Sequence, residues 1–373
     1  KQKLEIYCII LKLKKGCFMN PFVCIMLIFA TIGLIDKILD NKFGLASAFD
    51  KGIITMGDFM LSISGFYCIS IAFLRNNTEI LNRLGDFLFF DPSVLIGSLL
   101  APDLGGYSIV EMISKDPNMI VFAGVLLTST IGATISFQLP IFLNNLEKDD
   151  VPSFMQGIAY GLIVLPIVLI LVSLFLQIDS LMINMIPLLV LCILLLFMFF
   201  INLKLSVKIL TIFANMIRIL GYLFFFLVCL TFFFDLGFTQ QDLIKEVFSI
   251  VFQMTLIVAG SLVLCQLILK YFSLQIEKLA TILHINQYAL IGLILSLGTS
   301  IAMMPLFSKM DTKGKLINAA FSVSGAYVFG GQLGFIASVS NSFSTTIFII
   351  AKLSAGILAI LMVYLFTKRR MEN

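Results

Sequence analysis

Long uninterrupted apolar runs constrain this chain more than any other feature of its sequence. Residues 181–203 carry no charged side chain, and residues 209–234 carry only Arg218. An apolar stretch of about 18 residues or more with few charges is typical of a membrane-spanning helix. Because every backbone polar group in lipid must be bonded within the protein, only helices and closed barrels cross a bilayer. The runs are continuous rather than alternating, so the sequence predicts an all-α polytopic membrane protein.

The overall composition agrees with a protein surrounded by lipid. Of the 373 residues, 60% are hydrophobic and 12% are charged, whereas soluble globular proteins carry about 25% charged residues. The net charge of +4 is spread over short loops, which argues against a nucleic-acid partner. His284 is the single histidine, and no two of the seven cysteines have metal-ligand spacing. We therefore expect no metal site and no other cofactor.

Motifs of nucleotide-driven and catalytic proteins are absent from the sequence. It contains no phosphate-binding loop of the form G-x-x-x-x-G-K-[ST] and no nucleophile elbow of the form G-x-S-x-G. We therefore expect a chain that is not an enzyme and that does not use ATP directly. A solute that it moves would be driven by its own gradient or by coupling to H⁺ or Na⁺. Assembly into a homo-oligomer is left open.

The two ends of the chain lie outside the predicted membrane region. The sequence begins with Lys1, and its first methionine is Met19, directly before the first apolar run. We expect residues 1–18 to be an extension upstream of the native start. Residues 368–373 are expected to be a cytoplasmic tail.

Eleven hydrophobic segments alternate with short polar loops. Two of them, 89–105 and 287–306, are short and contain Pro, Gly and polar residues, which is typical of broken or re-entrant helices in transporters. The full set is 21–36, 52–74, 89–105, 119–143, 154–177, 181–203, 209–234, 247–272, 287–306, 316–339 and 345–367.

Lysines and arginines in short loops predict the orientation, because they are enriched on the cytoplasmic side. The basic residues of 368–370 place the C-terminus inside, and the three lysines of 309–315 also fit inside. If residues 287–306 crossed fully, Lys204 and Lys208 would lie outside and break the rule. We therefore favour nine spans with two re-entrant segments, and eleven full spans is the alternative.

The two short segments resemble each other in sequence. Aligned without gaps at an offset of 195 residues, 84–100 and 279–295 share six identities. A charged loop and a span rich in Gly, Ser and Thr follow in both halves. We predict two inverted repeats, 19–177 and 205–367, joined by a transmembrane helix at 178–204. Inverted repeats with broken helices are typical of secondary transporters, whose substrate site lies near the membrane midplane where the repeats meet.

An ionisable side chain inside a span is costly in lipid, so it is a candidate for function. Asp103 lies among the Pro and Gly residues of 102–106, where freed carbonyls and a carboxylate would hold a cation. Tyr107 would add an aromatic face for an ammonium group. The alternative is a helix-end aspartate in a wet loop. Asp58 is a second candidate, either for ion coupling or as a first-turn carboxylate that the helix dipole favours.

Several uncharged polar residues and one lysine lie in other spans. Thr134 is one of several hydroxyl residues that either pack helices or belong to a coupling network. Gln138, Asn318 and Gln332 are larger than the residues that usually pack helices, and we expect them to line the site. Lys352, in the last span, either snorkels to the interface or pairs with a carboxylate.

At these residues the chain resembles the ethanolamine-utilisation membrane proteins of the EutH family, from about residue 19 to residue 366. The resemblance rests on ordered stretches rather than on one motif. These are 91–93, 99–101, 103–106, 132–135, Pro140, 310–311, 313–315, 318–326 and 333–335.

The resemblance implies uptake of ethanolamine, a small cationic amine, across the inner (cell) membrane of a bacterium. It agrees with Asp103 as the counter-ion of the ammonium group, and we expect Gln332, Asn318 and Gln138 to bind the hydroxyl group while the repeats alternate access. The chain departs from the family at Gly331 and Gln332, where members often carry an Asp-His pair. A related amine or amino alcohol is therefore the alternative substrate.

Two other classes of function stay open. An ion channel would use the broken helices as a filter, but filters are commonly built from rings of carbonyls or charges, whereas this chain supplies single carboxylates. A membrane-embedded enzyme or a non-transporting accessory protein is the third class. An enzyme should show paired catalytic groups at one interface, and the sequence offers no convincing pair.

Overall fold

Eight helices are long and apolar enough to cross a membrane within residues 20–76 and 89–371, the part of the chain that the computed structural model describes. A ninth results if the bent pair Ser273–Ile282 and Gln287–Gly298 is one span. All regular structure in these residues is helical, which confirms the predicted all-α polytopic membrane protein. The extension predicted at 1–18 lies outside the described residues.

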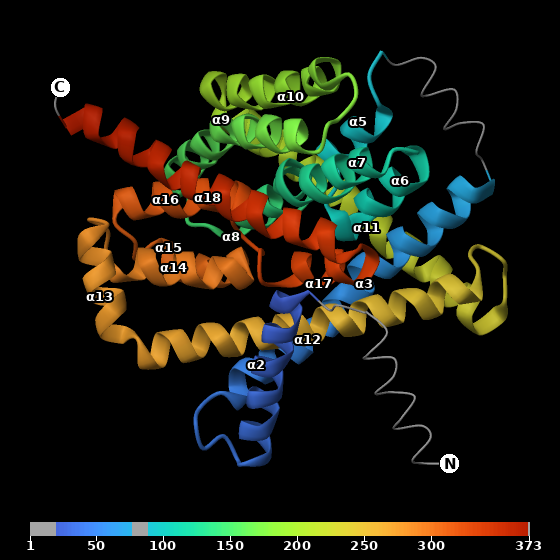
Figure 1. The fold of residues 1–373 in the computed structure, drawn as a ribbon, viewed down its shortest axis with the longest axis horizontal. Coiled ribbons are helices and arrows are strands. Elements are labelled where there is room, and N and C mark those ends of the chain that lie inside the picture. Colours follow the sequence, from blue (N-terminus) through green and yellow to red (C-terminus); the bar gives the residue numbers. More distant parts are fainter. Residues whose placement is uncertain (1–19, 77–88, 372–373) are drawn as a thin grey trace.

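We call the helices before α10 (Leu181–Ile201) the first half and those after it the second half; Figure 1 shows α10 at the edge of the bundle. The first half contains α2 (Pro21–Ile38), α3 (Ala46–Asn76), α5 (Pro92–Leu99), η1 (Pro102–Leu104), α6 (Gly106–Ile113), α7 (Pro117–Met119), η2 (Ile120–Gly132), η3 (Thr134–Gln138), α8 (Leu139–Asn145) and α9 (Val151–Phe175). The second half contains α11 (Leu203–Phe234), α12 (Gln241–Tyr271), α13 (Ser273–Ile282), α14 (Gln287–Gly298), η4 (Ser300–Met303), α15 (Met304–Phe307), α16 (Thr312–Ser324), α17 (Gly331–Val339) and α18 (Ser342–Met371).

The 195-residue offset extends to the bounds of the long helices. α3 and α12 begin and end 195 residues apart, and so do the starts of α5 and α14 and the starts of α7 and α16. Helix caps recur at the same spacing: Asp91 and Asn286 cap α5 and α14, and Asp116 and Asp311 cap α7 and α16. The offset relates α2 to α11 and α3 to α12. The packing of α2 against α12 is therefore equivalent to the packing of α11 against α3. The repeat therefore covers both halves, and its predicted boundaries stay a prediction.

α5 and α14 enter the bundle from opposite ends of α9. Asp91, before α5, donates its backbone N–H to Asn184 Oδ1 (2.8 Å), just beyond the C-terminal end of α9. Asn286, before α14, donates its backbone N–H to the cap of α16 (2.9 Å), and Lys315 of α16 forms an ion pair (2.6 Å) with Asp150 at the start of α9. Inverted halves require this arrangement. The inversion itself and the membrane side of each end stay predictions.

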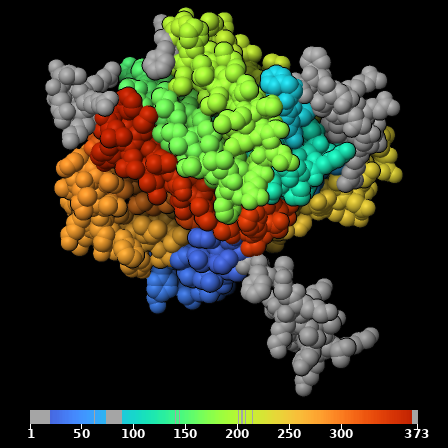
Figure 2. Space-filling view, turned by 45° about the horizontal axis from the view of Figure 1, so that its top comes forward, coloured from blue at the N-terminus to red at the C-terminus, as the bar shows by residue number. Residues whose placement is uncertain are grey.

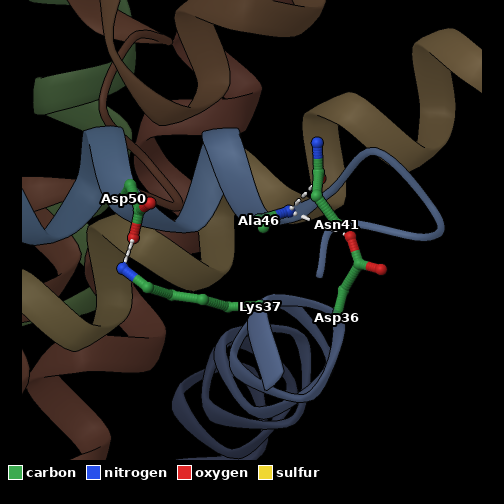
Figure 3. Close-up of polar contacts among 5 residues, drawn as sticks. All are labelled: Asp36, Lys37, Asn41, Ala46 and Asp50. Atoms are coloured by element: carbon green, nitrogen blue, oxygen red, sulfur yellow. Dashed lines mark hydrogen bonds and ion pairs between the residues drawn. The ribbon is translucent and has the colours of Figure 1, made fainter. Parts of the chain in front are cut away.

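A buried carboxylate fixes the turn between α2 and α3. Asp36 accepts three backbone N–H groups of the turn at 2.6 to 3.0 Å. One of these belongs to Ala46, which also donates to Asn41 Oδ1 (3.1 Å). Figure 3 shows the neighbouring Lys37 reaching from α2 to Asp50 on α3, with which it forms an ion pair. The first turn of α3 is thereby capped, so the buried backbone N–H groups at this helix start have acceptors.

The predicted continuous span at 316–339 is wrong, because the chain breaks between α16 and α17. Tyr327 in this break has a left-handed backbone (φ 62°), and Gly330 has φ −115° and ψ −138°, neither of which continues a helix. The equivalent first-half segment, η2 to α8, stays continuous, with wide turns in which Ala133 N–H bonds to Thr128 O five residues back. The breaks predicted in 89–105 and 287–306 are both present.

The outer surface is apolar, as lipid contact requires. α10 lies on the outside of the bundle, where Figure 2 shows it in yellow-green beside α9. Met182, Ile193 and Phe197 on α10 are each more than 60% exposed. By contrast, α16 and η2 lie in the interior, packed against α18 and α9. The interior helices are therefore the ones that can carry a solute site.

Candidate functional site

The first break separates α5 from α6 and presents Asp103. α5 ends at Leu99, the backbone of Leu100 is extended (φ −115°, ψ 139°), and one short turn over Pro102–Leu104 follows. Gly105 then takes a left-handed conformation (φ 85°) before α6 begins. Only glycine adopts this conformation without steric cost. The prediction that Pro and Gly open the helix around Asp103 is confirmed.

The second break is formed by two chain segments that lie side by side. α14 ends at Gly298, and the break between α16 and α17 runs along it. Tyr327 donates its backbone N–H to Ser296 O (2.9 Å), and Phe329 donates to Leu297 O (2.9 Å). A Cβ atom on Gly330 would lie 1.7 Å from Gly298 O, so the two backbones touch. Backbone groups released by the breaks therefore bond to each other within the interior.

Tyr327 connects the two breaks. Its hydroxyl is hydrogen-bonded to Ser300 Oγ at the start of η4, and its ring packs edge-on against Phe137 (centroids 6.1 Å apart). Half-buried Asp103 lies in η1, which packs against α17, the helix that follows the break at Tyr327. A left-handed backbone at a bulky residue stores strain, and such strain is concentrated at functional sites. We call Asp103, Ser300 and Tyr327 the carboxylate site.

Lys352 forms a second cluster deeper in the bundle. Its side chain is 1% exposed, and Nζ donates to Ser129 O (2.6 Å) and to Gln332 Oε1 (2.8 Å). The ring of Phe348 lies 5.4 Å from Nζ. Both interpretations from the sequence are therefore wrong: Lys352 does not snorkel, and its acceptors are a carbonyl and an amide rather than a carboxylate. The predicted Gln332 does line this cluster, which we call the lysine bridge.

Tyr107 lies at a different place from the one that the sequence suggested. Its buried ring packs against Phe335, and its hydroxyl donates to Val339 O (3.2 Å) and approaches Glu111 Oε1 (3.4 Å). Tyr107 and Glu111 line an open cavity of about 310 Å³ at the ends of α6 and α17. These contacts occupy the Tyr107 hydroxyl away from the breaks, so the expected ammonium contact beside Asp103 stays a prediction.

Two predicted residues belong to the wide-turn segment. Thr134 donates its hydroxyl to Thr130 O (2.8 Å) and lies 3.4 Å from Val323 O on α16. Gln138 is 1% exposed, and its Nε2 finds no acceptor among the described residues. Thr134 therefore links the two halves, and Gln138 keeps a buried donor that a solute could use.

Asn318 and Asp58 belong to neither the carboxylate site nor the lysine bridge. Asn318 is fully buried and donates its Nδ2–H groups to Ala289 O (2.8 Å) and Gly314 O (3.0 Å), which ties α14 to α16. Its Oδ1 has no donor among the described residues. Asp58 is exposed on α3, and the next residue, Phe59, lies against Gly331. Site roles for these two residues stay predictions.

Several residues of these clusters and of the cavity were not predicted as site residues from the sequence, among them Tyr327, Ser300 and Glu111. Tyr327 and Ser300 lie at the second break, where clustered glycines (Gly325, Gly330) gave the available signal. Glu111, beside the cavity, gave a signal too, because it is a carboxylate within an apolar stretch. The glycines on either side of Tyr327 mark a place where a helix can break, but they do not by themselves predict the break.

Metal binding finds no support in the described part of the chain, which contains no group of three or more His, Cys, Asp or Glu residues able to hold a metal ion. A monovalent organic cation needs fewer charged ligands than a metal ion. One carboxylate with nearby hydroxyl or aromatic groups is enough to bind an ammonium group, and the carboxylate site supplies these.

Comparison with known proteins gives a consistent result along the whole chain. The family model described as "Ethanolamine utilisation protein, EutH" matches residues 19–366. A protein named "Probable ethanolamine permease EutH" from Listeria monocytogenes serotype 1/2a (strain 10403S) is 30% identical over 361 residues, which cover 94% of each chain. "Uncharacterized protein YxeR" from Bacillus subtilis (strain 168) is 29% identical over 352 residues, covering 91% of this chain and 92% of that protein.

More distant relatives carry the same name. "Probable ethanolamine permease EutH" from Escherichia coli (strain K12) is 26% identical over 379 residues, covering 90% of this chain and 92% of that protein. No solved structure matches the chain.

Proposed function

Because the chain belongs to the EutH family of ethanolamine utilisation proteins, we propose that it is a permease for ethanolamine or a related small amine. Membership and the eight apolar helices make it a multi-pass membrane protein of the permease class. We place it in the inner membrane of a bacterium with its C-terminus in the cytoplasm. The substrate is the finer part of the proposal.

The carboxylate site is the observation that carries this substrate. Asp103 lies at a helix break whose short turn packs against α17, next to the break that holds the Tyr327 hydroxyl and its hydrogen bond to Ser300. Ethanolamine carries an ammonium group at one end and a hydroxyl group at the other. A carboxylate would bind the ammonium, and the Ser300 and Tyr327 pair offers both a donor and an acceptor for the hydroxyl.

The same geometry supports alternating access. Asp103 belongs to the first half, and Ser300 and Tyr327 belong to the second, so the carboxylate site lies where the halves meet. A relative movement of the halves would open this site to one side of the membrane and then to the other. Gln138 and Asn318, with their unsatisfied buried atoms, are the next candidates for solute contacts on this path.

Uptake of radiolabelled ethanolamine into proteoliposomes at pH 6 tests the proposal. We expect saturable uptake by the wild type and a loss of about tenfold or more in Asp103→Asn, since removing a buried charge pair costs several kcal/mol. Asp149→Asn, in the exposed loop before α9, is the matched control and should transport normally. If folded wild type takes up no ethanolamine, the substrate is wrong. If Asp103→Asn transports normally, the carboxylate site is wrong.

A further inference from the structure

Lys352 lies well inside α18, a helix long and apolar enough to span a membrane. Lys352 is the eleventh residue of α18. At a rise of 1.5 Å per residue, it lies about 15 Å along this helix, which is half of a hydrocarbon core of about 30 Å. An ionisable group at that depth is rare, because its desolvation is costly. The position therefore needs an explanation beyond helix formation.

The surroundings of Nζ are those of a primary-ammonium site. Ser129 O and Gln332 Oε1 accept at 2.6 and 2.8 Å, and the Phe348 ring lies at 5.4 Å. Among the described residues, Lys352 forms no ion pair. Two neutral oxygens and an aromatic ring bind an ammonium group without fixing it as tightly as a carboxylate would. Such a site can release its occupant.

Helix packing does not require a side chain at this position. The residue 195 positions earlier is Gly157 on α9, where a Cβ atom would lie 2.5 Å from the Cβ of Ala319. Four residues further along, both helices keep a glycine, Gly161 on α9 and Gly356 on α18. Lys352 is therefore an addition to one half of a shared packing pattern. Its acceptors come from both halves, since Ser129 lies in η2 and Gln332 in α17.

We propose that Ser129 O and Gln332 Oε1 form a second primary-ammonium site, on the path between the halves, and that Lys352 occupies it while no substrate is bound. This inference rests on the proposed function. The lysine side chain ends in the same CH₂–NH₃⁺ group as ethanolamine, so the two groups compete for the same oxygens. Two ammonium groups so close together would repel each other. Passage of the substrate therefore requires Lys352 to leave, and the bridge between the halves opens as it does.

Chemical rescue of Lys352→Ala tests the site without transport. This substitution removes three carbons and the ammonium group, which n-propylammonium replaces. We expect n-propylammonium at millimolar concentration to raise the thermal unfolding midpoint of purified Lys352→Ala by several degrees, and 1-propanol to leave it unchanged. Wild type, in which Lys352 itself occupies the two oxygens, should not respond. A folded Lys352→Ala that gains nothing, or an equal gain in wild type and Lys352→Ala, overturns the proposal.

Transport kinetics of Lys352→Met give a second measure that does not need the alanine variant to fold. Methionine ends one atom short of Nζ, so it keeps the stem but removes the competing ammonium. We expect a severalfold lower KM for ethanolamine. A purely structural lysine would instead leave KM unchanged and lower the maximal rate, which would overturn the competition. If the wild type transports no ethanolamine, the proposed substrate fails, while n-propylammonium rescue still decides whether the ammonium site exists.

Discussion

Residues 117–145 and 312–339 hold the same place in the two halves, yet only the first stays a continuous helix. Both segments begin after an aspartate cap, Asp116 and Asp311, and both are buried in the interior. The first passes through wide turns from η2 to α8, whereas the second ends at Ser324 and restarts at Gly331. Similar apolar patterns thus produce different backbones at equivalent positions of the two halves.

Side-chain hydrogen bonds and glycines account for the difference. In the first half, Thr130, Thr134 and Ser136 each donate a hydroxyl to the carbonyl four residues earlier, which keeps loosened turns bonded. In the second half, Gly330 permits a backbone that touches Gly298, and the released N–H groups bond across to the end of α14. The first segment satisfies its backbone hydrogen bonds within itself, whereas the second satisfies them with carbonyl groups of α14.

The polar chemistry is concentrated where the halves differ. At the 195-residue offset, Asp103, Ser300, Tyr327 and Lys352 correspond to Gly298, Gly105, Gly132 and Gly157. Each of these four residues therefore stands where the other half has a glycine. A duplicated scaffold supplies two equivalent places for close packing, and one of each pair carries a polar side chain instead. The comparison predicts that substitutions at matched positions have unequal effects.

Gly330→Ala should have the largest effect on stability. The new methyl group would lie 1.7 Å from Gly298 O, and a clash with backbone cannot relax by a rotamer change. We expect a loss of about 3 kcal/mol or more, at the upper end for overpacking. The matched first-half residue is Ile135, and Ile135→Val should cost about 1 kcal/mol. Denaturation in detergent measures both, and equal costs would show that the second break is not a fixed feature.

The two buried glutamines should respond in opposite ways. Gln332→Leu leaves the Lys352 ammonium with one oxygen acceptor, and we expect a loss of about 2 kcal/mol. Gln138→Leu removes a donor that has no acceptor among the described residues, so it should be neutral or stabilising.

A double variant distinguishes the loss of the hydrogen bond from the loss of side-chain packing. Gln332→Leu with Lys352→Met removes both partners, so most of the stability should return, because partners in contact are not additive. Unfolding of the single and double variants under the same conditions gives the coupling. A strictly additive result would mean that contacts of each residue with its other neighbours, rather than the bond between Gln332 and Lys352, determine the loss.

The sequence predicts most of the scaffold because membrane spans depend on local composition. The apolar runs, the broken segments around Asp103 and before Ser300, and the 195-residue offset all follow from local patterns. The break within 316–339 does not follow, since Gly325 and Gly330 are also compatible with a continuous span. Whether a glycine breaks a helix there depends on α14, which accepts the freed N–H groups and is close only in the folded chain.

The candidate site was predictable in part for the same reason. Asp103 could be found because a carboxylate beside Pro and Gly in a span is unusual by itself. Lys352 could not be placed, because snorkelling or burial depends on whether acceptors such as Ser129 O lie within reach. Tyr327 carries no local signal of its left-handed backbone. Contacts between segments far apart in sequence decide these cases.

Tyr327→Phe tests the contribution of the Tyr327 hydroxyl to the carboxylate site. It removes the hydroxyl that is bonded to Ser300 but keeps the ring against Phe137, so we expect a loss of about 1 kcal/mol. Ser300→Ala should cost about the same, and the pair together should cost little more than either alone. KM for ethanolamine should rise in each. An unchanged KM would place the substrate hydroxyl elsewhere, with Gln138 as the next candidate.

The smallest effect is expected at two surface ion pairs, one between α2 and α3 and one within α12. Lys37 on α2 pairs with Asp50 on α3, whereas Lys245 pairs with Asp242 within α12. Both are largely exposed, so Lys37→Gln should cost less than about 1 kcal/mol, and the loss should shrink as salt is added. Lys245→Gln should cost less still, because its pair joins no second helix. Unfolding at low and high salt measures both. A salt-independent loss for Lys37→Gln would mean that the Lys37 side chain stabilises the α2–α3 turn by packing rather than by charge. The buried Asp36 cap would then not hold this turn by itself.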